Sequence, residues 1–222
     1  MDHRFSQEKI DGVYQAIYER RDIREFTQEK LPEGLMDRLF HAAHFAPSVG
    51  YMQPWRMIHI KSPEIRQQVA NLVEAERQST ASQLPSRQQE FLKLKIEGLA
   101  SCQEVVVIAL MQGREAHIFG RRTMPEMDLA SAACAIQNMW LAARAEGAGL
   151  GWVSFFEPEK LAKLLNMPEG ATPIAILCIG SVAQFPEKPL LDILGWGKRL
   201  PMEQVVFTDL WPEDAPSTPP AY

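Results

Sequence analysis

The sequence predicts an α+β fold, in which helices cover a mixed central sheet, within a single domain that spans residues 1–222. Three observations indicate this fold. Helix-like segments outnumber short strand-like ones, and no internal repeat is visible. A chain of 222 residues, 46% of them hydrophobic, is long enough to bury one sizeable core. The proline-rich residues from about 186 to 222 are expected to form an extended C-terminal arm.

The elements follow from local patterns along the chain. Helices are predicted over residues 10–20, 35–45, 65–78, 88–99, 129–145 and 158–165. The helix over 129–145 is apolar on almost all sides, which indicates a core helix or a dimer seam. Strands are predicted over residues 55–60, 105–111, 147–156 and 174–179. Residues 79–86, between two polar helices, are expected to form a flexible connector or lid.

The charge of the chain bears on its partners. A net charge of −5 gives no reason to expect a nucleic acid or an anionic membrane surface as partner. The longest apolar run, Val105–Met111, is far shorter than the ~20 residues of a membrane span. Basic residues are nevertheless concentrated around positions 20–24, and such a local cluster indicates a small anion as ligand.

The N-terminus and the cysteines together predict a cytoplasmic protein. The residues MDHRFSQEKIDGVYQ carry charges where a signal peptide needs an apolar core. Cys102, Cys134 and Cys178 are widely spaced and each has apolar neighbours, which predicts buried thiols in a reducing compartment. His41 and His44 lack a carboxylate at matching spacing, so no metal site is predicted.

Residues 20–26, RRDIREF, place three arginines around one carboxylate, Asp22. Arginines in such a cluster bind phosphate through charge-assisted hydrogen bonds. The alternative explanation is a solvated helix end, where cations offset the helix dipole. Asp22 does not help to bind an anion, so its position within the cluster requires a different explanation.

Three further motifs favour a ligand site over a plain helix end. The loop APSVGYMQPW offers the hydroxyl of Ser48 and the amide of Gln53, whose donor and acceptor suit a flavin pyrimidine edge. The glycines of GLGWVS (149–154) are expected to let the backbone approach a flat ring. This motif does not predict a dinucleotide site, because a tryptophan replaces the third glycine of that fingerprint. Arg199 in GWGKR adds positive charge for the same phosphate.

Four segments together resemble the 5,6-dimethylbenzimidazole synthase family, flavin-fragmenting enzymes of the nitroreductase-like superfamily. The segments are RRDIREF, HFAPSVGYMQPWR, RRTMPEMDLASAACAIQNMWLAARAEGAGLGWVSFF and ILGWGKRLPMEQVVF. The resemblance runs from about Arg20 to Trp211 and implies a nitroreductase-like fold. Its most specific features are Asp22 within the arginine cluster and Ser154 in GWVSFF, because ordinary nitroreductases usually have serine where Asp22 stands.

The resemblance implies that reduced FMN (FMNH₂) is the substrate. O₂ adds to it and the ring system is fragmented to 5,6-dimethylbenzimidazole, the lower ligand of vitamin B12, while the sugar leaves as erythrose 4-phosphate. Asp22 would be the general acid/base, kept ionised by the positive charge of the arginines. Ser154 would be the second catalytic residue, bonded to the flavin or its oxygen adduct. The residues expected to bind FMN are Arg20, Arg21, Asp22, Ile23, Arg24, Ser48, Gln53, Trp152, Ser154 and Arg199.

A homodimer is expected, with the flavin at the subunit interface, because the apolar helix and the arm both need a partner to cover them. The sequence leaves open whether the protein reduces FMN with NAD(P)H or receives FMNH₂ from a separate flavin reductase. Two alternatives remain: an NAD(P)H-dependent nitro- or quinone reductase that retains FMN, and a non-catalytic flavin-binding module. Ala130 stands where a larger aromatic residue is expected, and Lys198 could equally belong to a dimer clasp.

Overall fold

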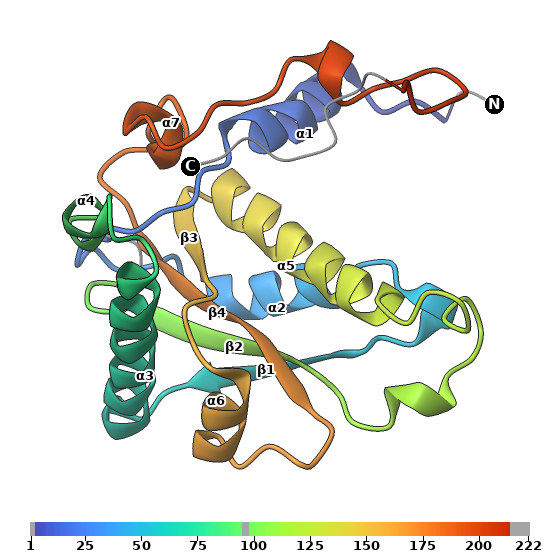
Figure 1. Ribbon diagram of the computed structural model, residues 1–222. Helices are drawn as coiled ribbons and strands as arrows, with labels where there is room; N and C mark the ends of the chain where they lie inside the picture. The colour runs from blue at the N-terminus through green and yellow to red at the C-terminus, as the bar shows by residue number, and fades with distance from the viewer. Residues whose placement is uncertain (1–2, 95–97, 214–222) are drawn as a thin grey trace. The chain divides into compact units, whose positions relative to one another are not determined.

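Four antiparallel strands form the centre of the computed structural model, in the order β1-β2-β4-β3 (Figure 1). The strands are β1 (Trp55–Ile60), β2 (Glu104–Leu110), β3 (Ala148–Val153) and β4 (Thr172–Ser181). The structure describes residues 3–94 and 98–213. Within these residues, the mixed character that the sequence predicts is limited to one parallel bridge, between Asp22 and Leu150.

Helices cover both faces of this sheet (Figure 1). One face packs against α2 (Leu35–His44) and α5 (Met127–Ala145), and the other against α3 (Pro63–Ser82) and α6 (Pro158–Leu164). The remaining short elements of this part of the chain are α1 (Gln7–Glu19), η1 (Val49–Tyr51), α4 (Gln88–Leu92) and η2 (Arg114–Ala116).

The buried strand β2 shows why the sheet has two cores. Its side chains alternate between faces, as the two-residue period of a strand requires. Val106 and Ile108 belong to the core beneath α2 and α5, whereas Val105 and Val107 belong to the core beneath α3 and α6. The continuous apolar run that predicts this strand therefore reflects burial on both sides, and the α+β class is confirmed.

Helix α5 begins two residues before its predicted start and ends at Ala145 as expected. Its small residues Ala132, Ala135 and Ala143 are at most 1% exposed and let the helix approach the sheet closely. The prediction of three buried thiols is wrong at Cys134, which lies on the exposed side of this helix, whereas Cys102 and Cys178 are buried. Apolar neighbours along a helix do not decide which side of it faces the core.

Two predicted helices and the connector between them differ from the structure. Helix α3 continues to Ser82 and takes in the first half of the expected connector 79–86, since no glycine or proline interrupts it there. The helix expected over 88–99 is reduced to α4, and residues 95–97 of that prediction lie outside the described part. Within the described chain, no helix combines the length and the apolar character needed to cross a bilayer.

The chain from Pro186 forms a second compact unit. It contains α7 (Leu190–Ile193) and the short 3-10 helix η3 (Met202–Gln204). Phe207 and Trp211 pack with their ring centroids 5.2 Å apart. This unit starts where the sequence predicts the C-terminal arm; its description as an arm of a single domain stays a prediction.

Candidate active site

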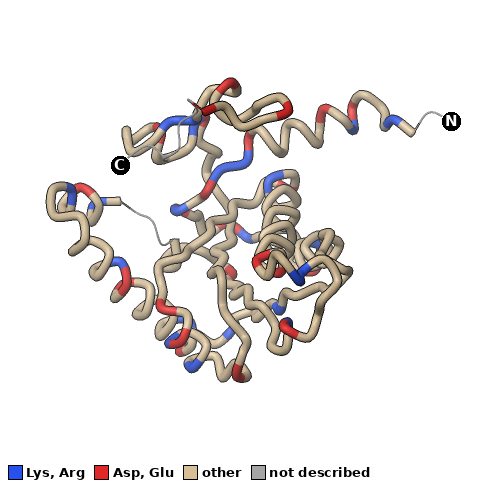
Figure 2. The backbone as a smooth tube through the Cα atoms, turned by 45° about the vertical axis from the view of Figure 1, so that its right-hand side comes forward, with Lys and Arg blue, Asp and Glu red and all other residues tan. Residues whose placement is uncertain are grey.

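The segment that follows α1 runs alongside β3 and brings the arginine cluster to the edge of the sheet. The Ile23 N–H donates to the Leu150 carbonyl at 3.1 Å, next to the parallel bridge between Asp22 and Leu150. Figure 2 shows the basic residues of this segment interrupted by an acidic one. Because Ile23 is 5% exposed, it anchors the segment in the core while its neighbours reach the surface.

Asp22 is held by two groups, one at each carboxylate oxygen. Oδ1 accepts a hydrogen bond from the Trp152 backbone N–H at 2.9 Å, and Oδ2 accepts one from Arg24 Nη2. The same Nη2 donates to the Trp152 carbonyl at 2.7 Å. These three bonds form a closed network that fixes the carboxylate against β3. The structure therefore brings Asp22, Arg24 and Trp152 together.

Burial raises the pKa of Asp22 above its ordinary value, against the opposing effects of Arg24, the Trp152 N–H and Arg20. The sequence predicts the reverse balance, in which the arginines dominate. The difference from the predicted balance has a physical reason. Packing against β3 removes water from the Asp22 carboxylate, although its side chain keeps 41% of its accessible surface. A partly exposed carboxylate with a raised pKa is better suited to proton transfer than one with an ordinary pKa.

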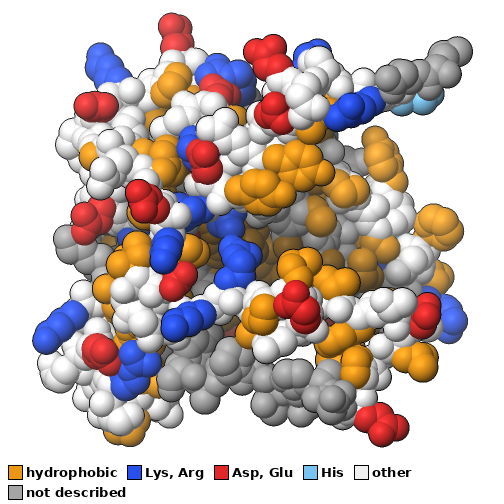
Figure 3. All heavy atoms as spheres, turned by 90° about the horizontal axis from the view of Figure 1, so that it is seen from above, with side chains coloured by type: hydrophobic (Ala, Val, Ile, Leu, Met, Phe, Trp, Pro, Cys, Tyr) orange, Lys and Arg blue, Asp and Glu red, His pale blue; other side chains and the backbone are white. Residues whose placement is uncertain are grey.

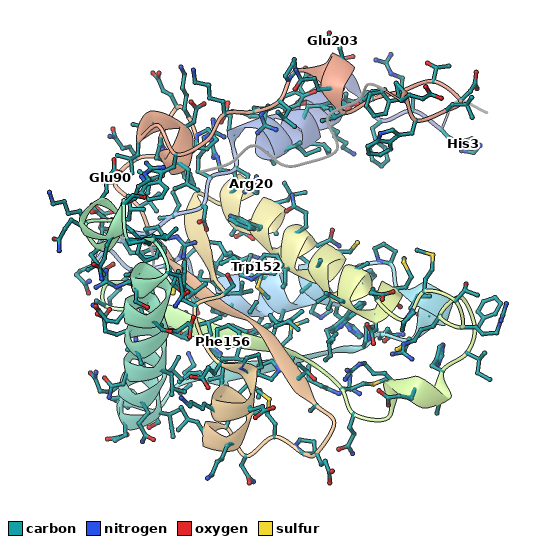
Figure 4. The ribbon with its side chains drawn as sticks, viewed as in Figure 1. His3, Arg20, Glu90, Trp152, Phe156 and Glu203 are labelled. Atoms are coloured by element: carbon teal, nitrogen blue, oxygen red, sulfur yellow. The ribbon has the colours of Figure 1, made fainter. Side chains whose placement is uncertain are left out.

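Arg20 and Arg21 lie at the C-terminal end of α5. The Arg20 guanidinium stacks over the Trp140 ring, 4.5 Å from its centroid, and Figure 4 shows Arg20 beside this end of the helix. Trp140 Nε1 donates to the Arg21 carbonyl at 3.1 Å. Arg21 Nη1 donates to the carbonyl of Tyr18 at 2.7 Å. The two cations are thus fixed beside the partly exposed Asp22.

Trp140 contacts the arginine cluster, although the sequence analysis does not name it among the expected site residues. Trp140 does belong to the core, at 8% exposure, but it also carries Arg20 and lies 6.5 Å from Trp152, centroid to centroid. One signal was available: a buried indole N–H needs an acceptor. The acceptor itself, the Arg21 carbonyl, is 119 residues away in the chain and could not be read from the sequence.

Arg24 is the arginine of the cluster that bonds to the Asp22 carboxylate. Its side chain is 11% exposed, and its Nη1 is buried with no hydrogen-bond acceptor among the described residues. Its Nη2 is already shared between Asp22 and Trp152. This geometry favours a role in positioning Asp22 over direct contact with a phosphate.

Gly149 and Gly151 leave room for a neighbouring segment of the chain. A Cβ on Gly151 would overlap the Ile23 carbonyl oxygen, and a Cβ on Gly149 would lie 3.1 Å from the Ile23 side chain and overlap Val182. The backbone that approaches these glycines is therefore the protein's own arginine segment; a flat ring at this motif stays a prediction.

Ser48 and Gln53 form a separate site. The Gln53 N–H donates to Ser48 Oγ at 3.0 Å, and Gln53 adopts a φ of 51°. The loop is tied to the first half of α5 by the Val49 N–H, which donates to Ser131 Oγ at 3.0 Å. Ser131, which holds this loop, and Trp140, which contacts the arginine cluster, are nine residues apart on α5, a rise of about 14 Å along the helix axis. The loop and the cluster are therefore anchored at different points along α5.

The other predicted residues are placed as follows. Ser154 is exposed and lies just past the end of β3, two residues beyond Trp152. Arg199 belongs to the unit that starts at Pro186, so its part in the site stays a prediction. Among the described residues, histidine, cysteine, aspartate and glutamate form no group of three or more that could hold a metal ion.

A groove opens next to Gln53, beside the edge strand β1. It has a volume of ≈ 430 Å³. Its lining combines aromatic and polar side chains: Phe40, His44, Gln53, Trp55, Arg56, Met57 and His59. Trp55 Nε1 donates to His44 Nδ1 at 3.4 Å across its wall. The Gln53 amide thus borders an open groove.

Comparison with known proteins agrees with this architecture. Residues 17–181 match the nitroreductase family. The chain is 36% identical over 201 residues to a 5,6-dimethylbenzimidazole synthase of Rhodobacter capsulatus, an alignment that covers 90% of this chain and 97% of that protein. It is 35% identical over 193 residues to the protein of the same name from Rhodospirillum rubrum, with 86% and 92% covered. A BluB-like flavoprotein from Clostridium difficile 630 has the same fold, with a TM-score of 0.68 at 16% identity, covering 88% of this chain and 97% of that one.

The chain therefore belongs to the nitroreductase family and, within it, to the 5,6-dimethylbenzimidazole synthase family. The resemblance drawn from the sequence is confirmed, and so is the nitroreductase-like fold.

Proposed function

We propose that this protein is a 5,6-dimethylbenzimidazole synthase, an oxidoreductase that fragments reduced FMN with O₂ to 5,6-dimethylbenzimidazole and erythrose 4-phosphate. The observation that carries the proposal is the Asp22 carboxylate, held against Trp152 within the arginine cluster with a raised pKa. Relatives of that name at 33–36% identity over nearly the whole chain support it.

The residues present fit a phosphate-bearing flavin. Arg20 and Arg21 supply guanidinium groups, which form the strong, charge-assisted bonds that phosphate requires. Both are fixed by Trp140, through its ring face and its N–H respectively. Reduced FMN, as the substrate, supplies the electrons for O₂ and the dimethylbenzene ring of the product. The chain supplies binding, orientation and proton transfer.

Asp22 moves protons near the ribityl C1′ and the ring in this proposal. The exposed part of its side chain gives access to a ligand. Its raised pKa makes it a better acid/base catalyst than a carboxyl group with an ordinary pKa. Arg24 positions it, through the bond to Oδ2. Ser154 follows β3 at the same edge and offers a hydroxyl as donor or acceptor to the ligand.

The ligand site is completed by a second copy of the chain. The Ser48–Gln53 loop and the arginine cluster are anchored about 14 Å apart along α5, so within one chain they would meet different parts of the flavin. Hydrophobic side chains are exposed on the surface, as Figure 3 shows for one face. The exposed aromatic side chains on α1 and on the Ser48–Gln53 loop include Tyr14 (51%), Tyr18 (69%) and Tyr51 (84%). A symmetric dimer would cover these residues and bring the Ser48–Gln53 loop of one copy to the cluster of the other.

The proposal also concerns the source of the reduced flavin. We take FMNH₂ to come from a separate flavin reductase, with NAD(P)H as the alternative direct reductant. The competing function is an NAD(P)H-dependent nitro- or quinone reductase that retains its FMN, which the family match alone would equally support. The two differ in the fate of the flavin: a retained cofactor leaves the purified protein yellow and is regenerated, whereas a substrate is consumed.

The test is to supply chemically reduced FMN and air to the purified protein and to quantify 5,6-dimethylbenzimidazole by mass spectrometry. Product that accumulates in proportion to the FMN lost is expected. Complete recovery of the flavin as oxidised FMN, together with steady NAD(P)H-dependent reduction of a quinone, would establish the reductase instead.

A further inference from the structure

A second carboxylate, Asp128, lies outside the site described above and binds two arginines. Its side chain is 6% exposed, at the start of α5. Arg114 Nε lies 2.8 Å and Arg121 Nη2 3.1 Å from its Oδ2. Its Oδ1 accepts from the Leu129 N–H at 2.6 Å. Both arginines are nearly buried, at 11% and 13% exposure, so the cluster is a built internal anchor.

The two arginines bracket one stretch of chain, residues 114–121, and Asp128 ties down both of its ends. Arg114 is further fixed by the carbonyls of Met111 and Gly170. Removing one partner of a nearly buried ion pair is strongly destabilising, so the loss of Asp128 would free both ends of the 114–121 segment from this anchor.

The 114–121 segment packs directly against the Ser48–Gln53 loop. His117 Nε2 lies 3.2 Å from the Gly50 carbonyl oxygen. A Cβ on Gly50 would come within 2.7 Å of both His117 Nε2 and the Phe119 carbonyl. On the other side of the contact, a Cβ on Gly120 would lie 2.8 Å from Val49 Cγ2. The two stretches thus meet at glycines, with no room for a side chain, so a displacement of one displaces the other.

We propose that Asp128 is a positioning residue for the flavin: through Arg114, Arg121 and the 114–121 segment it sets the place of Ser48 and Gln53. The inference rests on the proposed function, which assigns those two residues to the ligand. Ser131, one turn further along α5, holds the Val49 N–H of the same loop. The first turns of this helix therefore fix the loop from two directions, through Asp128 and through Ser131.

The first experiment measures the coupling in the protein without flavin. Arg121→Met removes one cation from Asp128, and amide hydrogen exchange followed by mass spectrometry is expected to speed up both in residues 114–121 and in residues 48–53. The matched control is Arg66→Met, which removes an arginine that holds the carbonyls of Leu99 and Gln103 on the other face of the sheet. The control is expected to affect residues 98–103 and to leave 48–53 unchanged. Faster exchange in 114–121 with an unchanged 48–53 loop would overturn the inference.

The second experiment measures ligand affinity. Arg121→Met is expected to raise the dissociation constant for FMNH₂ by about 10-fold, the effect of weakening one hydrogen bond from the displaced loop. Arg121→Lys, which can keep one bond to Asp128, is expected to restore part of the affinity. Gly120→Ala should weaken binding through the clash with Val49, and its effect should not add to that of Arg121→Met, because both act on one contact.

The outcomes separate the inference from the proposed function. If the wild-type protein binds FMNH₂ and forms product while Arg121→Met binds it equally well, the positioning role is wrong and the proposed function stands. If the wild-type protein forms no product, the proposed function fails, and the hydrogen-exchange coupling still decides whether Asp128 controls the loop.

Discussion

Asp22 and Asp128 are both carboxylates bound to arginines, yet the structure places them in opposite situations. Each accepts a backbone N–H at one oxygen, but Asp128 is 6% exposed and binds two arginines at the other, whereas Asp22 is 41% exposed and binds one. An enclosed ion pair can only hold the chain in place. A carboxylate that is fixed on one side and open on the other can also exchange a proton with a ligand. Exposure, more than the number of arginines, separates the two roles.

Asp22→Asn tests this contrast most directly, because it keeps the shape of the side chain and removes its proton exchange. The variant should still bind FMNH₂, because losing a negative charge beside arginines does not harm phosphate binding. It should also still consume O₂ and release oxidised FMN. Formation of 5,6-dimethylbenzimidazole is expected to drop by about 10²–10⁴-fold, the range for a lost general acid/base. Mass spectrometry of the product against O₂ uptake measures this; near-normal product formation would remove Asp22 from the chemistry.

Asp128→Asn should instead act on stability. Removing one partner of a nearly buried ion pair leaves two arginines without their counter-charge, and the free energy of unfolding is expected to fall by about 3–5 kcal/mol. The control is Glu146→Gln, which opens the more exposed pair with Arg38, at 30% and 48% exposure. That change should cost about 1 kcal/mol or less. Urea unfolding followed by tryptophan fluorescence compares the two; equal losses would mean that Asp128 is not the anchor described above.

Arg24→Ala separates positioning of Asp22 from binding of phosphate. A hydrogen bond to a charged group is worth about 1.5–3 kcal/mol, so product formation is expected to fall about 10- to 100-fold with a smaller loss of flavin affinity. The pH dependence of product formation is expected to shift in a definite direction. Arg24 lowers the pKa of Asp22 against the effect of burial, so its removal raises that pKa further. If ionised Asp22 is required, the acid side of the profile moves to higher pH. A loss confined to affinity, with an unshifted profile, would instead place Arg24 on the phosphate.

Features that depend on neighbours in sequence were predictable. The strand β1 and most of α5 have the expected bounds, because a periodic pattern of apolar residues decides them locally. The arginine cluster was also visible, since its members lie within five positions. The family resemblance rests on such local motifs and is confirmed for the same reason.

Features that depend on the partner across the fold were not predictable. The raised pKa of Asp22 comes from packing against β3, which is about 130 residues further along the chain and invisible in RRDIREF. The role of Gly151 depends on the Ile23 carbonyl beside it, and the exposure of Cys134 depends on which side of α5 meets the sheet. In each case the residue type pointed to a special position, but the sequence did not show which distant part of the chain packs against it.

Mixing two variants that are each nearly inactive tests whether two chains share each site, and the expected gain in activity is modest. Asp22→Asn removes proton exchange at the cluster, and Gln53→Gly removes the amide from the loop at a φ of 51°, which glycine adopts without strain. Each variant alone should lose most product formation. If Asp22 of one chain works with Gln53 of the other, a mixed dimer has one doubly damaged and one intact site. Random reassociation gives half mixed dimers, so an equal mixture should regain roughly a quarter of wild-type activity. Each variant reassociated alone is the control, and a mixture no more active than the average of the two controls would place the whole site within one chain.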